Sequence, residues 1–91
     1  MSLDASVRIP EDVVFRELNG EAILLKLDTG VYFGLDAVGT RIWLLLNDLG
    51  VLRAVHARVL DAFDVAPSVL ERDLVGFVGE LHQRGLVSID S

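Results

Sequence analysis

The chain has 91 residues, of which 52% are hydrophobic and 24% charged, with a formal net charge of −6 and no cysteine. This length fits one domain, and the apolar content excludes intrinsic disorder as the main state. The longest apolar run, residues 42–46, is far shorter than the roughly 20 residues that span a bilayer. The absence of cysteine excludes disulfides, thiolate metal sites and cysteine nucleophiles. Because the N-terminus shows no secretory signal either, we expect a small acidic protein of the cytoplasm with no membrane partner.

The N-terminal segment has no clear hydrophobic period. Pro10 disfavours a helical conformation at Ile9 and marks the entry into the first regular element. We expect an N-terminal arm over residues 1–10, followed by a single folded domain over residues 11–91. No internal repeat interrupts that domain.

Three β-rich segments follow the arm, over residues 12–18, 21–27 and 31–35. Asn19-Gly20, between the first two, is a strong hairpin signal because both residues tolerate positive φ. For the second turn, a three-residue loop over residues 28–30 collects the most apolar side chains on one face of the sheet. That register predicts a core face made of Val14, Leu18, Ile23, Leu25, Leu27, Val31, Phe33 and Leu35. The opposite face is then mixed, with Val13, Phe15, Leu24 and Tyr32 beside Glu17 and Lys26.

Apolar residues then recur at spacings of three and four, which predicts helices over about residues 37–49, 52–63 and 69–84. Asp36 is a suitable N-cap for the first helix, and Gly50 ends it. Ser68 and Glu71 have the spacing of a capping box at the start of the third helix.

We expect a short strand over residues 86–89, after the third helix. The element order indicates the α+β class, with a three-stranded antiparallel sheet packed on three α-helices.

The sequence offers no set of catalytic or metal-binding residues. His56 and His82 lie on different predicted helices, and neither has the spacing of a metal-binding pair. The acidic residues are spread along the chain, and no nucleophile has a base and an orienting group assigned to it. We therefore expect no catalytic residue, no metal and no cofactor. The net charge of −6 also disfavours nucleic acid as a partner.

The third predicted strand has the properties of an open edge. Proteins normally protect an edge strand with charge or proline, and neither occurs in Val31, Tyr32, Phe33 and Gly34. An added peptide strand could therefore hydrogen-bond to it. The alternative is that residues 86–89 or the N-terminal arm cover this edge.

One flank of the third helix combines polar side chains with a small gap. At about 100° per residue, Val69, Asp73, Gly76 and Glu80 share one side, next to the apolar Phe77. A solvated helix face is the simpler interpretation. A groove between this flank and the third strand would instead suit a peptide better than a small metabolite.

Two long runs carry a resemblance to a known family: LNGEAILLKLDTGVYFGLDAVGTRIWLLL and FDVAPSVLERDLVGFVGELHQRGLV. The chain resembles the pyrroloquinoline quinone synthesis protein D (PqqD) family over about residues 12–89. The order and spacing of several residues carry this resemblance: Gly30, Leu35, Asp36, Gly39, Ile42, Trp43, Asp73, Phe77, Leu81 and Gly85-Leu86.

The resemblance implies a winged-helix-like fold and a role as a recognition element for ribosomally made, modified peptides. Family members hold the leader region of a precursor peptide, which adds as a strand to the third strand and lies along the third helix. That role falls here on Val31, Tyr32, Phe33, Gly34, Val69, Asp73, Gly76, Phe77 and Glu80.

The resemblance also implies partners. The chain looks like a standalone member of a lasso-peptide system, in which a leader protease and a cyclase process the bound precursor. The alternative within the family is a chaperone for the precursor peptide of pyrroloquinoline quinone synthesis, whose partner would be a radical enzyme. A structural dimerisation domain is a further alternative, because the outer sheet face is mixed. The oligomeric state stays open.

Overall fold

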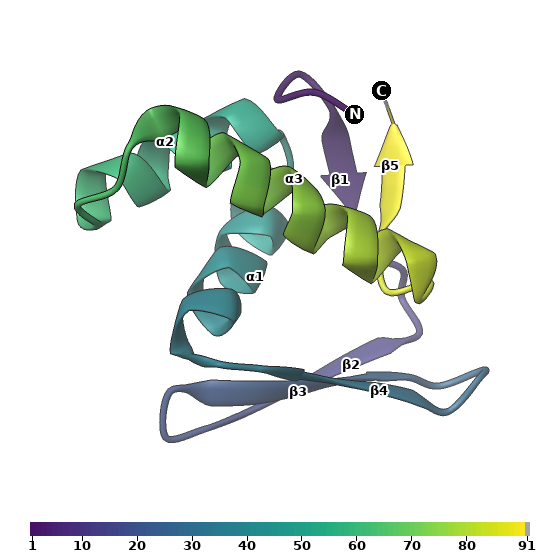
Figure 1. Ribbon diagram of the computed structural model, residues 1–91. Coiled ribbons are helices and arrows are strands. Elements are labelled where there is room, and N and C mark those ends of the chain that lie inside the picture. The colour runs from purple at the N-terminus through teal and green to yellow at the C-terminus, as the bar shows by residue number, and fades with distance from the viewer. Residues whose placement is uncertain (91) are drawn as a thin grey trace.

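A computed structural model describes residues 1–90 and shows an antiparallel sheet below a layer of helices (Figure 1). The elements in chain order are β1 (Ser6–Arg8), β2 (Val13–Leu18), β3 (Glu21–Lys26), β4 (Val31–Leu35), α1 (Ala37–Leu49), α2 (Leu52–Ala62), α3 (Pro67–Gln83) and β5 (Ser88–Asp90). The predicted α+β class and the order of three strands followed by three helices are confirmed.

The main sheet is a meander of order β2-β3-β4. Asn19 and Gly20 connect β2 to β3 with φ values of 56° and 82°, as the predicted type I′ turn requires. β2 and β4 are therefore the two edges of this sheet.

The predicted pairing of β3 with β4 is wrong by one residue. Lys26 pairs with Val31, so the loop holds four residues, 27–30, instead of the predicted three. A shift of one residue moves every side chain of a strand to the other face. Leu24 is consequently fully buried opposite Phe33, whereas Ile23 is 52% exposed opposite Gly34.

The observed register places Lys26 on the core side of the sheet, a position that the hydrophobic pattern alone disfavours. Its ammonium Nζ lies 2.7 Å from Oδ1 of Asp12 and 3.8 Å from Oδ1 of Asp28. The aliphatic stem of a lysine can cover apolar surface while its charged end meets a partner. The salt bridge with Asp12, fourteen residues away in the sequence, offsets the unfavourable free energy of placing a charged residue on this face of the sheet.

The segment predicted as an arm packs against the helices. Leu3, Ala5 and Val7 are buried, and β1 pairs antiparallel with β5, with Val7 opposite Ile89. The predicted last strand thus forms two residues later than expected, and its partner is β1. In Figure 1 this ribbon stands above the sheet, beside the C-terminal end of α3.

The helix ends follow local sequence signals with one exception. The Asp36 carboxylate caps α1 by accepting the N–H of Gly39 at 2.7 Å, and Gly50 ends the helix with φ 79°. The predicted capping box at Ser68 is wrong, because α3 begins at Pro67, two residues before the predicted start, with no side-chain cap. Proline at the first helical position has its φ pre-set and no N–H to satisfy, so it starts the helix by itself.

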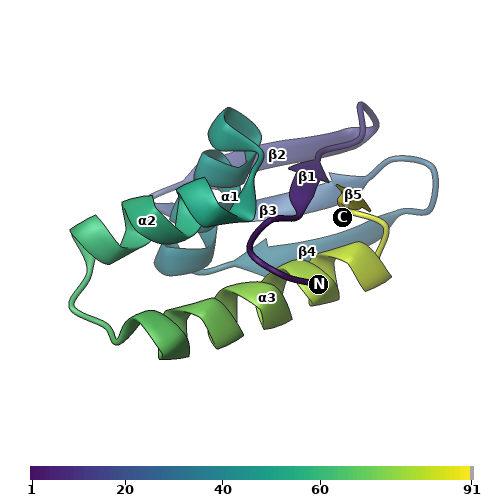
Figure 2. The ribbon, with the colours of Figure 1, turned by 90° about the horizontal axis from the view of Figure 1, so that it is seen from above.

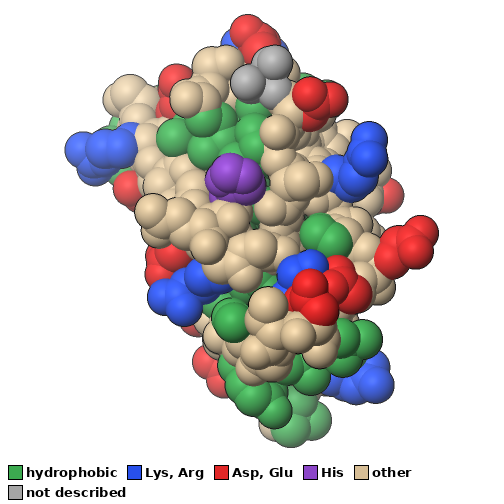
Figure 3. All heavy atoms as spheres, turned by 90° about the vertical axis from the view of Figure 1, so that its right-hand side faces the viewer, with side chains coloured by type: hydrophobic (Ala, Val, Ile, Leu, Met, Phe, Trp, Pro, Cys, Tyr) green, Lys and Arg blue, Asp and Glu red, His purple; other side chains and the backbone are tan. Residues whose placement is uncertain are grey.

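The core lies between the helices and one face of the sheet. Its largest fully buried side chains are Leu24, Leu46, Leu52, Leu74, Leu81 and Leu86. The other face of the sheet bears exposed apolar residues, among them Leu18 at 76% and Tyr32 at 68% exposure. Figure 3 shows hydrophobic side chains gathered at the lower end of the molecule, where the sheet lies in Figure 1. Within residues 1–90, no helix is both long and apolar enough to cross a membrane.

Candidate functional site

The outer edge of β4 is open. β4 is hydrogen-bonded to β3 on one side, and no strand of residues 1–90 pairs with its other side. The alternative that the arm or the C-terminal strand covers this edge is excluded for the described residues, because β1 and β5 pair with each other. A strand edge in this state presents free backbone N–H and C=O groups.

Helix α3 runs alongside this edge (Figure 2). The ring centroids of Phe33, on β4, and Phe77, on α3, lie 6.4 Å apart. The guanidinium carbon of Arg84, which ends α3, lies 5.1 Å from the centroid of the Phe33 ring. These contacts place the C-terminal end of α3 beside the middle of β4 and leave a groove between the two elements.

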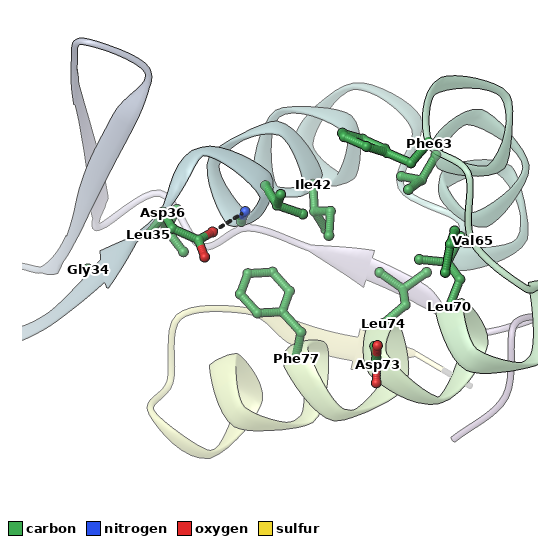
Figure 4. Close-up of a pocket in the computed structure, with 13 residues that line it drawn as sticks. Gly34, Leu35, Asp36, Ile42, Phe63, Val65, Leu70, Asp73, Leu74 and Phe77 are labelled. Carbon is green, nitrogen blue, oxygen red and sulfur yellow. Dashed lines mark hydrogen bonds between the residues drawn. The ribbon is translucent and has the colours of Figure 1, made fainter.

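The groove widens into a cavity of about 580 Å³ where β4 ends and α1 begins. Figure 4 shows Ile42, Leu74 and Phe77 converging on this cavity from α1 and α3. Phe63 and Val65, in the joint between α2 and α3, close its far end. The cavity has a mostly apolar lining drawn from β4, α1, α2 and α3, and its size is within the range of ligand-binding pockets.

The structure brings only part of the predicted site into the cavity. Gly34, Asp73 and Phe77 line it, and Phe33 adjoins it through the Phe77 ring. The other predicted residues lie along the edge of β4 or the exposed flank of α3: Val31, Tyr32, Val69, Gly76 and Glu80. A Cβ at Gly76 would meet no atom within 4 Å, so no other backbone approaches α3 there.

None of the other ten lining residues was predicted as part of the site. They are Leu35, Asp36, Val38, Gly39, Ile42, Val59, Phe63, Val65, Leu70 and Leu74. Two of them, Val38 and Phe63, are 48% and 38% exposed. For Phe63 a sequence signal was present, because it follows Val59 at helical spacing on the apolar side of the second predicted helix.

Charges of both signs lie along the groove: the guanidinium carbon of Arg41 lies 5.8 Å from the centroid of the Phe63 ring, which lines the cavity. Asp36 and Asp73 line the cavity end. Arg84 stands at the other end, and its side-chain partner is Glu80, with Nη2 and Oε1 3.4 Å apart. Both members of this pair are about half exposed, so it contributes little stability.

The Lys26 ammonium lies near the Arg84 end but is already paired. A Cβ at Gly85 would lie 3.6 Å from Cε of Lys26. The hydrogen bond that the Lys26 ammonium donates to the Asp12 carboxylate raises the pKa of Lys26 and lowers the pKa of Asp12. Each shift shows that the charged form of the pair is favoured in the folded chain.

Within residues 1–90, no three His, Asp or Glu side chains are grouped so as to hold a metal ion. The geometry suits recognition of an extended chain: a strand edge for its backbone, an apolar cavity for its side chains and charges at both ends.

Comparison with known proteins identifies the family. Residues 21–87, well over half of the chain, match the family described as coenzyme PQQ synthesis protein D (PqqD). The chain belongs to the PqqD family. A search of curated sequences found no match.

Two solved structures share the fold of this PqqD-family chain. One is described as TbiB1 in complex with the TbiA(beta) leader peptide; it is 37% identical, with a TM-score of 0.85 over 89% of this chain and 94% of that one. The other is described as lasso peptide synthetase B1 complexed with the leader peptide; it is 20% identical, with a TM-score of 0.82 over 91% and 98% of the two chains. The second likeness concerns the fold alone.

Proposed function

We propose that this chain binds the leader region of a ribosomally synthesised precursor peptide, by strand addition to the open edge of β4 beside α3. The observation that carries the proposal is the free β4 edge, which faces α3 next to an apolar cavity of about 580 Å³. The similarity to TbiB1, whose structure includes a leader peptide, supports a leader peptide as the partner, and the sequence resemblance favours a lasso-peptide precursor.

Strand addition uses both the free edge of β4 and the apolar cavity. The peptide backbone pairs with the free N–H and C=O groups of β4, which contributes affinity without regard to sequence. Alternate side chains of an extended peptide point to opposite faces, so every second one points towards α3 and the cavity. The apolar walls formed by Ile42, Leu74 and Phe77 then select large apolar side chains at those positions.

The role we propose is recognition without catalysis, followed by delivery of the bound precursor to a leader protease and a cyclase. A precursor peptide of pyrroloquinoline quinone synthesis is the second candidate, favoured by the description of the matching family. Comparing the affinities of the two kinds of precursor for the chain separates these candidates.

The proposal is tested by titrating the isotope-labelled chain with the TbiA(beta) leader peptide and following backbone amide shifts. We expect saturable binding, with a Kd between about micromolar and nanomolar and shifts centred on residues 31–36 and 70–84. Shifts centred on β1, β5 or the exposed face of α2 would contradict the proposed site.

A matched pair of variants tests the cavity. Phe63 lines it and is 38% exposed, whereas Leu44, on α1, is 43% exposed and lies outside it. We expect Phe63→Ala to weaken leader binding by about tenfold, because truncating an aromatic anchor in a binding pocket costs about 1–2 kcal/mol or more. Leu44→Ala should leave binding unchanged. Equal effects of the two changes would show that the cavity does not contribute to binding.

A further inference from the structure

The Arg84 guanidinium lies beside β4 in the groove, and its N–H donors have few acceptors among the described side chains. It stacks on Phe33, a residue of the open strand, at 5.1 Å from the ring centroid. A guanidinium has five N–H donors, and the side-chain acceptor that Arg84 has here is Glu80, at 3.4 Å. Lys26, the other cation at this end, is held by Asp12 and Asp28. Arg84 is therefore the cation with donors left for a ligand.

The cavity end of the groove has two carboxylates in its lining, and Arg41 stacks on Phe63 of the same lining. Asp36 and Asp73 line the cavity, and one oxygen of Asp36 is already used to cap α1. The salt-bridge partner of Asp73 is Arg72, with Nε and Oδ1 3.8 Å apart and both side chains largely exposed. An anionic side chain placed at this end would meet two carboxylates.

The separation of the two ends matches an extended peptide. Asp73 and Arg84 are eleven residues apart along α3, which corresponds to about 16 Å at 1.5 Å per residue. Along β4, Phe33, on which Arg84 stacks, is three residues from Asp36, which corresponds to about 10 Å in extended conformation. Two peptide side chains that face the groove and are four residues apart are separated by about 13 Å, which lies between these two spans.

We propose that Arg84 is a specificity residue that binds a carboxylate side chain of the peptide, while the Asp36 and Asp73 end selects against carboxylates and favours a basic side chain. This inference rests on the proposed function. The sheet is antiparallel throughout, and the added strand continues that order. The N-terminal end of the peptide then lies at Asp36, so the basic residue precedes the acidic residue by four positions.

The test uses the TbiA(beta) leader peptide, synthesised as a set in which each position in turn carries Glu or Lys. Against the unaltered chain, we expect one position to favour Glu by about fivefold, the size of a partly exposed ion pair. A position four residues nearer the peptide N-terminus should favour Lys. Arg84→Glu should reverse the first preference, Arg84→Lys should retain it, and Asp73→Lys should reverse the second.

A control of equal charge separates contact from general electrostatics. Arg84→Gln and Gln83→Glu each lower the net charge by one, from −6 to −7, in the same turn of the chain. We expect only Arg84→Gln to abolish the preference for Glu. If both changes act alike, the effect is long-range and Arg84 is not a contact residue.

The outcomes separate this inference from the proposed function. Failure of the unaltered chain to bind the unsubstituted leader would contradict the proposed function, and the inference would fail with it. Normal binding with no position that reverses in the Arg84→Glu variant would overturn the inference alone. A Glu-favouring position on the N-terminal side of the Lys-favouring one would overturn the antiparallel direction.

Discussion

The strands β1 and β4 each lie beside a helix, but within residues 1–90 they differ in how their edges are paired. β1 pairs with β5, and its neighbourhood is tied to the start of α2 by backbone hydrogen bonds, from Val7 N–H to the Gly50 carbonyl at 2.8 Å and from Arg53 N–H to the Leu3 carbonyl at 2.8 Å. β4 lacks a partner on its outer side within residues 1–90 and faces a cavity. The closed region satisfies its own backbone and supplies stability, whereas the open region leaves backbone groups and apolar surface for a peptide.

The largest expected effect is a loss of stability when packing in the closed region is disrupted. Leu52 is fully buried at the start of α2, next to the bonds that anchor the N-terminal segment. We expect Leu52→Ala to lower the free energy of unfolding by about 2–5 kcal/mol, through lost transfer energy and the cavity that remains. Urea denaturation followed by circular dichroism measures this. The variant chains that remain folded should still bind the leader peptide, and a loss of affinity in them would show that the two regions are coupled.

A smaller effect, an increase in stability, is expected from a substitution on α3 in the open region. Gly76 is exposed on α3, and a Cβ there would meet no atom within 4 Å. Alanine is favoured over glycine inside a helix by about 0.8–1 kcal/mol, so Gly76→Ala should raise the free energy of unfolding by about that amount. The melting temperature checks this prediction. A decrease would show that the flank of α3 is packed against something that this account leaves out.

The smallest effect is a change in the pH dependence of stability. The pKa of Asp12 is lowered from 3.8 by its hydrogen bond with Lys26. The resulting stabilisation is therefore present above 3.8 and is lost as the pH falls through the lower, folded-state value. We expect Asp12→Asn to be less stable than the unaltered chain at neutral pH, with the difference shrinking in acid below 3.8. A difference that is independent of pH would mean that the ion pair contributes nothing.

Local signals in the sequence were sufficient for much of the fold. The Asn19-Gly20 hairpin and the capping of α1 by Asp36 depend on neighbouring residues alone, and both were predicted correctly. Pairings between distant residues were not predictable in the same way. The register of β3 on β4 depends on Lys26 meeting Asp12, and β1 meets β5 across almost the whole chain.

In the candidate site, too, the local feature was predictable and the feature formed by several elements was not. The β4 edge was identified because Val31–Leu35 has neither charge nor proline, which is a local property. The cavity was missed because its walls come from four elements. Val65 reaches it only through the joint between α2 and α3, which the hydrophobic period does not describe.

The central claim is that the leader peptide pairs with β4, and amide hydrogen exchange tests it within one sheet. β2 and β4 are both edges, so the outward-facing N–H groups of both exchange freely in the unbound chain. On addition of the TbiA(beta) leader peptide, we predict new protection of outward-facing amides in residues 31–35 and none in residues 13–18. Protection that appears on β2, or on neither edge while the peptide is bound, would contradict the account.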